Sequence, residues 1–138
     1  MGYEQKTDVA GNNAPIKNNL VVGVTVNKTL TREDSGSVFA IATDAIAITL
    51  PSTFLGEYTF INTGAAGNNI ITISPQAADG IAGTITLAGT VVTRVGTADA
   101  DLVNTKATST KGNSVKIVGT GVAGTGAWYI VSSTGIWA

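Results

Sequence analysis

The sequence predicts an all-β protein, with one β-sandwich, jelly-roll-like or barrel-like domain behind an extended N-terminal arm. Short runs of β-branched residues recur along the chain, and several alternate apolar with polar residues, as half-buried strands do. Glycine, asparagine and proline separate these runs. No long stretch has helical periodicity, so we expect less than about 10% helix, where a typical domain has roughly 30–35%.

Residues 1–19 are polar, and the glycine, asparagines and proline within 11–15 break any periodicity. Two interpretations stay open for this segment, a disordered tail and an extended arm that becomes ordered on a partner. The arm has three apolar residues that are candidate contacts to another subunit or to a capsid: Tyr3, Val9 and Ile16. The all-β domain is expected to span residues 20–138.

Within this domain the strands are expected at 20–26, 37–41, 45–50, 57–62, 69–74, 83–95, 114–119, 127–132 and 135–138. Pro51 and Pro75 end two of them, because proline cannot donate to a strand ladder. The segment 30–36 is expected to form one helical turn, in which Thr31 and Asp34 have the spacing of a capping box. These segments show no repeat of fixed period.

The composition excludes several classes of function. The chain has no histidine and no cysteine, which removes Ser-His and Cys-His nucleophiles and thiolate metal sites. Its formal net charge of −1 gives no electrostatic footprint for nucleic acid or an anionic membrane, and no apolar run approaches the roughly 18 residues of a membrane span. We therefore expect no catalytic residue, no cofactor, no metal, and neither a nucleic acid nor a membrane as partner.

The surface is expected to be unusually neutral. Charged residues make up 12% of the chain, whereas an ordinary soluble domain has about 25%. An isolated monomer with so few charges is poorly protected against association. This composition therefore favours a subunit whose surface is covered by copies of itself or by a partner.

Two motifs suggest ligands at first sight. Gly119 to Gly124 reads GTGVAG and follows a strand-like run, but a β-rich segment follows where a dinucleotide site needs a helix, and no acidic residue occurs after Asp101. We expect a glycine-rich loop between two strands. The segment 99–110 begins like a calcium loop but lacks its glycine and its final glutamate, which leaves at most a weak cation site at Asp99 and Asp101.

Catalysis by other residues has little support in the sequence. The nine acidic residues include no recognisable pair, and Asp34, Asp44 and Asp79 each stand beside turn-forming residues. Ser114 and Lys116 have the spacing of one strand face, but the better interpretation of Lys116 is a solvent-facing residue between two buried ones.

Both tryptophans, Trp128 and Trp137, lie in the segment GAWYIVSSTGIWA at 126–138. Such large side chains predict that this segment is held in place, since an aromatic residue buries about 150–250 Å². We expect two strands joined by a turn at 133–135, with Trp128 and Ile130 on one face and Tyr129 and Val131 on the other. Whether Trp137 fills the chain's own core or contacts a subunit stays open, so both tryptophans are candidate subunit or capsid contacts.

The segments TLTREDSGSVFAI, AITLPS, GEYTFINTGAAGNNIITISP and KGNSVKIVG, together with the closing GAWYIVSSTGIWA, resemble small structural proteins of tailed bacteriophages. The likeness is greatest to capsid decoration (cement) proteins and related β modules of phage fibres, and it runs from about Thr29 to Ala138. It implies a β-rich homotrimer without enzymatic activity that binds the major capsid protein on the outer surface of the virion. No functional residue can be transferred, because these proteins are defined by surface fit.

The leading hypothesis is therefore a head decoration protein that stabilises the capsid shell as a homotrimer, made in the host cytoplasm and ending on the virion. The alternative is a fibre or spike module that binds a host-surface glycan. Such a site needs exposed aromatic rings in a polar groove, and the available tyrosines and tryptophans are Tyr3, Tyr58, Trp128, Tyr129 and Trp137. A hydrolase that uses carboxylates is the third hypothesis.

Overall fold

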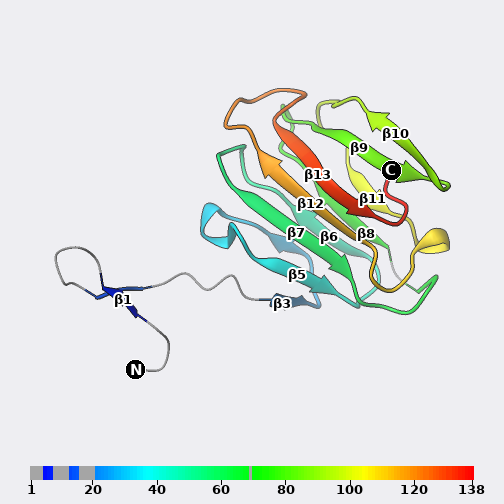
Figure 1. The fold of residues 1–138 in the computed structure, drawn as a ribbon, viewed down its shortest axis with the longest axis horizontal. Coiled ribbons are helices and arrows are strands. Elements are labelled where there is room, and N and C mark those ends of the chain that lie inside the picture. The colour runs from blue at the N-terminus through cyan, green and yellow to red at the C-terminus, as the bar shows by residue number, and fades with distance from the viewer. Residues whose placement is uncertain (1–4, 8–12, 16–20, 69) are drawn as a thin grey trace.

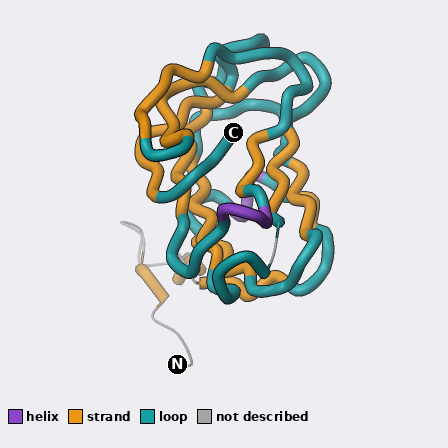
Figure 2. The backbone as a smooth tube through the Cα atoms, turned by 90° about the vertical axis from the view of Figure 1, so that its right-hand side faces the viewer, coloured by secondary structure: helices purple, strands orange, loops and turns teal. Residues whose placement is uncertain are grey.

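The protein is a sandwich of two packed β-sheets, as the sequence predicts (Figure 1). The structure, a computed structural model, describes residues 5–7, 13–15, 21–68 and 70–138. One sheet has seven strands in the order β10-β9-β13-β12-β7-β5-β3, and the other has four in the order β11-β8-β6-β4. Figure 2 shows the two layers of strands side by side with loops joining them at both ends.

The strands β3 to β8 alternate between the two sheets. Those in the seven-stranded sheet are β3 (Val21–Val24), β5 (Val38–Ile41) and β7 (Glu57–Asn62), and those in the other are β4 (Lys28–Thr29), β6 (Ile46–Thr49) and β8 (Ile71–Ser74). Within each sheet these strands pair in parallel. The chain therefore winds as a flattened coil with turns of unequal length, which explains why the sequence shows no fixed period.

The expected single strand at 83–95 is wrong, because this segment is a hairpin. Strand β9 (Ile81–Leu87) pairs antiparallel with β10 (Thr90–Arg94), so that Thr84 lies opposite Thr93. The turn consists of Ala88 and Gly89, both at positive φ (48° and 82°), which is the backbone of the two-residue hairpin turns that match strand twist. Glycine adopts this conformation readily, whereas alanine does so rarely.

Three further strands complete the sheets, β11 (Leu102–Asn104), β12 (Ser114–Gly119) and β13 (Trp128–Thr134). Strand β12 pairs antiparallel with β7 and with β13, and β13 runs parallel to β9. The pairing of β12 with β13 shifts between Lys116 and Ile117, which leaves Val131 as the extra residue of a β-bulge. Two short strands near the N-terminus, β1 (Gln5–Thr7) and β2 (Asn13–Pro15), pair antiparallel with each other.

Helix is confined to two short 3₁₀ turns in the described residues, η1 (Arg32–Asp34) and η2 (Lys106–Thr108). The first confirms the predicted turn, because the backbone N–H of Thr31 donates to Oδ2 of Asp34 over 2.9 Å, as in a capping box. Neither turn is long enough to cross a membrane.

The core fills the space between the sheets. The inward residues alternate with outward ones along each strand, for example in β7 and β12. A cluster of aromatic side chains lies at the centre of the core. In it, Tyr58 contacts Phe39, Phe60 and Trp128 at ring-centroid distances of 5.7–6.4 Å. Tyr58 also donates its hydroxyl to the carbonyl of Thr31 over 2.6 Å, so this buried polar atom has a partner.

The C-terminal segment closes the sandwich at one side, although it is not the second strand that the sequence predicts. Only Ile136 forms a bridge, to Thr86 of β9 in the seven-stranded sheet. Ala138 exchanges two backbone hydrogen bonds with Val103 of β11 in the four-stranded sheet, at 2.8 and 2.9 Å. The last residues therefore join the two sheets, and Gly135 at a φ of 88° ends the regular strand before them.

Candidate functional site

The outward-facing side of four neighbouring strands forms an almost uncharged surface, which we call the β3–β12 face. Its outward positions lie on β3, β5, β7 and β12: Val21, Gly23, Val38, Ala40, Glu57, Thr59, Ile61, Ser114, Lys116 and Val118. The only two charges, on Lys116 and Glu57, form an ion pair of 3.1 Å between Nζ and Oε2. A surface of aliphatic and small neutral residues with one internal ion pair can be covered by another protein at little cost of desolvating charge.

At the opposite edge of the same sheet, β9, β10 and β13 form an open groove of about 420 Å³, which we call the Tyr129 groove. The Tyr129 ring is 45% exposed and leans over Gly126, where a Cβ would lie 3.3 Å from the tyrosine hydroxyl. Exposed Val95 and the cross-strand pair Thr84 and Thr93 form further parts of the lining. The groove combines an aromatic ring, an aliphatic wall and hydroxyl groups.

Arg94 also lines the Tyr129 groove, but its guanidinium has a structural role. Its Nε donates to the carbonyl of Ile81, and its Nη2 donates to the carbonyls of Ala100 and Asp101, over 2.6–3.1 Å. These bonds fasten the loop after β10 to the start of β9. The lining contains no carboxylate. Its one cation, the Arg94 guanidinium, is partly engaged by backbone carbonyls.

A buried carboxylate positions the loop that closes the groove. Asp79 is 2% exposed and accepts hydrogen bonds from the backbone N–H groups of Thr53 and Gly124 over 3.2 and 3.1 Å. Thr53 in turn donates its hydroxyl to the carbonyl of Ala127 over 2.7 Å. Asp79 therefore fixes the segment that presents Thr125 and Gly126 to the groove, and its oxygens are already engaged by backbone donors.

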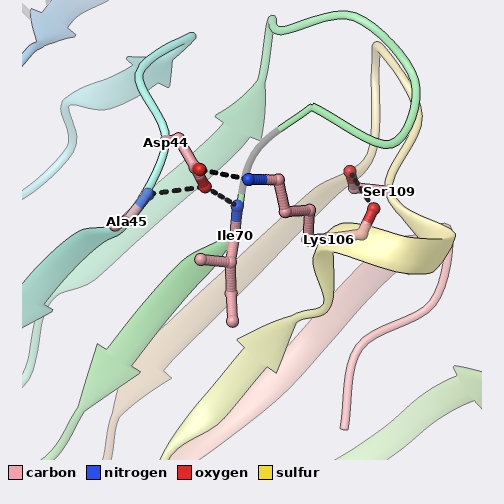
Figure 3. Close-up of polar contacts among 5 residues, drawn as sticks. All are labelled: Asp44, Ala45, Ile70, Lys106 and Ser109. Carbon is pink, nitrogen blue, oxygen red and sulfur yellow. Dashed lines mark hydrogen bonds and ion pairs between the residues drawn. The ribbon is translucent and has the colours of Figure 1, made fainter.

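An exposed ion pair joins three loops at another part of the sandwich (Figure 3). Asp44 accepts from Lys106 Nζ, from the backbone N–H of Ile70 over 3.0 Å and from that of Ala45 over 2.8 Å. The Lys106 hydrogen bond, followed by the Ile70 N–H, holds the pKa of the Asp44 carboxyl below its ordinary value. This arrangement is a clasp between loops, because every bond at Asp44 serves the chain's own backbone or side chains.

The predicted contact residues fall into two groups. Trp128 and Trp137 are both fully buried within the chain, and Trp137 Nε1 donates to the carbonyl of Thr134 over 3.2 Å. Their indole rings therefore fill the chain's own core. The other three, Tyr3, Val9 and Ile16, lie outside the described residues, so their role stays a prediction.

The expected alternation along β13 is confirmed. Trp128 and Ile130 point into the core, whereas Tyr129 and Val131 are 45% and 54% exposed. The aromatic residue that the structure presents to solvent is thus Tyr129. The sequence placed it on the outward face, but it gave no sign of a groove, because the groove depends on the hairpin turn at 88–89.

The motifs also have clear positions. Gly119 ends strand β12, and Gly121 and Gly124, both at positive φ, lie in the loop that leads to the antiparallel strand β13. Lys116 points outward between buried Val115 and Ile117, as expected. Asp99 and Asp101 are exposed, and among the described residues no three acidic side chains gather in a way that could hold a metal ion.

No protein-family model matches the chain, and a search of curated proteins finds no match. The function must therefore be argued from the residues and their arrangement.

Proposed function

We propose that the protein is a structural protein of a bacteriophage virion, a homotrimer that binds the major capsid protein on the outer surface of the head and stabilises the shell without catalysis. The β3–β12 face is the observation that carries this proposal. Each of its four strands contributes at least one aliphatic side chain, and its only two charges form an ion pair with each other. This chemistry suits a permanent contact with another protein.

We assign the β3–β12 face to the contact between subunits. Strand β3 is the edge of the seven-stranded sheet, and an unprotected edge with exposed valine is a liability unless something covers it. Val21 on this edge is 69% exposed. In a closed threefold ring this face would contact a second surface of the next subunit, and closure leaves the face open on no subunit.

The rest of the described surface supports docking on a shell. The outward positions of the four-stranded sheet are also small and neutral, among them Ala47, Thr49, Thr72 and Ser74. Such a surface forms many shallow contacts without burying unpaired charge. A trimer multiplies these contacts, because three copies bind one shell at high effective concentration.

The direct test mixes the purified protein with undecorated heads of the phage that encodes it. Bound copies are counted after sedimentation of the heads, and the survival of the heads on heating is compared with and without the protein. We expect saturable binding and a higher temperature of head disruption. If the protein leaves undecorated heads unbound, the decoration function is rejected.

Matched variants control for surface charge in general. Ala40→Glu places a carboxylate on the β3–β12 face, and Ala47→Glu makes the same change on the outward side of the four-stranded sheet as a control for the trimer. Ala66→Glu, at an exposed loop position outside both proposed contact surfaces, is the control for head binding. Ala40→Glu is expected to break the trimer and thereby weaken head binding by at least tenfold, which is about 1.4 kcal/mol. If monomeric Ala40→Glu binds heads as tightly as the native trimer, the multivalent mechanism is contradicted.

A further inference from the structure

We propose that the Tyr129 groove is a binding site for an uncharged sugar ring. The site goes beyond capsid decoration. It lies toward the β10 edge of the seven-stranded sheet and borders the β3–β12 face, because Tyr129 of β13 pairs with Val118 of β12.

The first argument is the position of the aromatic ring. Tyr129 is the only tryptophan or tyrosine of the described residues with a side chain substantially open to solvent, since Tyr58, Trp128 and Trp137 are fully buried. The hydroxyl end of its ring lies beside Gly126, where a Cβ would come within 3.3–3.8 Å of it, and both residues line the groove. An exposed aromatic ring in a groove offers a flat platform for the C–H face of a pyranose at low entropic cost.

The second argument is the hydrogen-bonding character of the lining. Thr84 and Thr93 lie directly opposite each other, both exposed, and neither hydroxyl is hydrogen-bonded to any part of the chain that the structure describes. Each hydroxyl can donate one hydrogen bond and accept two. Two adjacent free hydroxyls beside an aromatic platform match the alternating hydroxyl and C–H groups of a sugar.

The third argument concerns charge and size. The one charged residue of the lining, Arg94, uses its guanidinium on three backbone carbonyls, so a charged ligand gains little there. The volume of about 420 Å³ falls in the range of small-molecule sites, roughly 300–1,000 Å³. An apolar side chain of a protein partner would instead leave the two threonine hydroxyls covered and without partners.

The groove is also held in shape without the ligand. The backbone at Gly96 approaches the carbonyl of Thr125 so closely that a Cβ there would overlap it. Asp79 and Thr53 fix the loop that carries Thr125 by backbone hydrogen bonds. A pre-formed site loses less free energy on ordering when a weak ligand such as a monosaccharide binds.

The test uses ¹⁵N-labelled full-length protein and three neutral probes, methyl glucoside, methyl galactoside and N-acetylglucosamine, followed by NMR at millimolar concentrations. We expect saturable shifts of the amide signals of Thr84, Thr93 and Tyr129 with at least one probe. Glucuronate serves as the charged counterpart and is expected to bind no more tightly than methyl glucoside. Tighter binding of glucuronate, or the lack of saturable shifts with all three neutral probes, would overturn the proposal.

Three variants separate ring stacking from general damage to the surface. Tyr129→Ala is expected to reduce the affinity at least tenfold, whereas Tyr129→Phe keeps the ring and stays within about threefold of the native affinity. Val131→Ala changes an exposed residue on the same side of the same strand and is expected to leave binding unchanged. If Tyr129→Ala instead dissociates the oligomer, the groove is a subunit contact and the sugar site is rejected. The sugar-binding measurements do not depend on whether the protein binds heads.

Discussion

The side chains of Asn62 and Asn104 join the two sheets through a buried hydrogen bond, in which Nδ2 of Asn62 donates to Oδ1 of Asn104 over 2.8 Å. Asn62 ends β7 and Asn104 ends β11, so the bond connects the seven-stranded sheet with the four-stranded one. Asn104 Nδ2 donates onward to the side chain of Asn113 and to the carbonyl of Ile136. The polar network thus holds both sheets and the C-terminal segment together.

Truncating the centre of this network should destabilise the protein. In Asn104→Ala the amide of Asn62 and the carbonyl of Ile136 lose a partner inside the core, which costs roughly 1–3 kcal/mol for a buried unsatisfied group. Urea denaturation measures the change in the free energy of unfolding. Asn68→Ala, at an exposed loop position, is the control and should change it by less than about 0.5 kcal/mol.

Trp137 should act as a core residue. Its ring is fully buried and its backbone N–H donates to the carbonyl of Thr86. Trp137→Ala is expected to lower the free energy of unfolding by about 3–5 kcal/mol, as large-to-small aromatic changes in cores do. Thermal unfolding followed by circular dichroism checks this, and native-like stability of the variant would show that the C-terminal segment is not held as described.

The clasp at Asp44 predicts a dependence of stability on pH. Its pKa is lowered in the folded state, so its contribution is present above the ordinary value of 3.8 and is lost as the pH falls through the folded-state pKa. Asp44→Asn should therefore be less stable than the native protein near neutral pH. The difference between the two should shrink below about pH 4, as measured by urea midpoints across acidic pH. A constant difference over that range would exclude the clasp.

Two glycine substitutions test the close packing of the Gly96 backbone against the carbonyl of Thr125 at the Tyr129 groove. Gly96→Ala should push the backbone around Thr125 away and destabilise the protein by about 1–3 kcal/mol, the usual cost of overpacking. Gly23→Ala adds the same methyl group on β3, where no atom of the same chain lies within 4 Å of the new Cβ. It should be tolerated within about 1 kcal/mol. Comparable urea midpoints for the two variants would contradict the geometry of the groove.

Much of the fold was predictable because a strand with one buried face alternates apolar and polar residues along the sequence. The predicted strands at 57–62 and 114–119 have the same bounds as β7 and β12, and both alternate buried with half-buried residues. The capping pair Thr31 and Asp34 was visible because its spacing is local.

The rest depended on contacts between distant segments. Strands β4 and β11 are too short to show a period, and they exist because neighbouring strands pair with them. The hairpin turn was missed because Ala88 adopts a positive φ that its residue type disfavours. The Tyr129 groove follows from that turn, since the turn sets Thr84 opposite Thr93.

The mass of the protein in solution tests the central claim most directly, namely that the β3–β12 face is covered by copies of the chain. Multi-angle light scattering should give three times the chain mass of 13.9 kDa for the native protein and for Ala47→Glu. Ala40→Glu should give the mass of one chain while keeping the native circular dichroism spectrum. A native mass of 13.9 kDa across micromolar concentrations, or an intact trimer of Ala40→Glu, would contradict the claim.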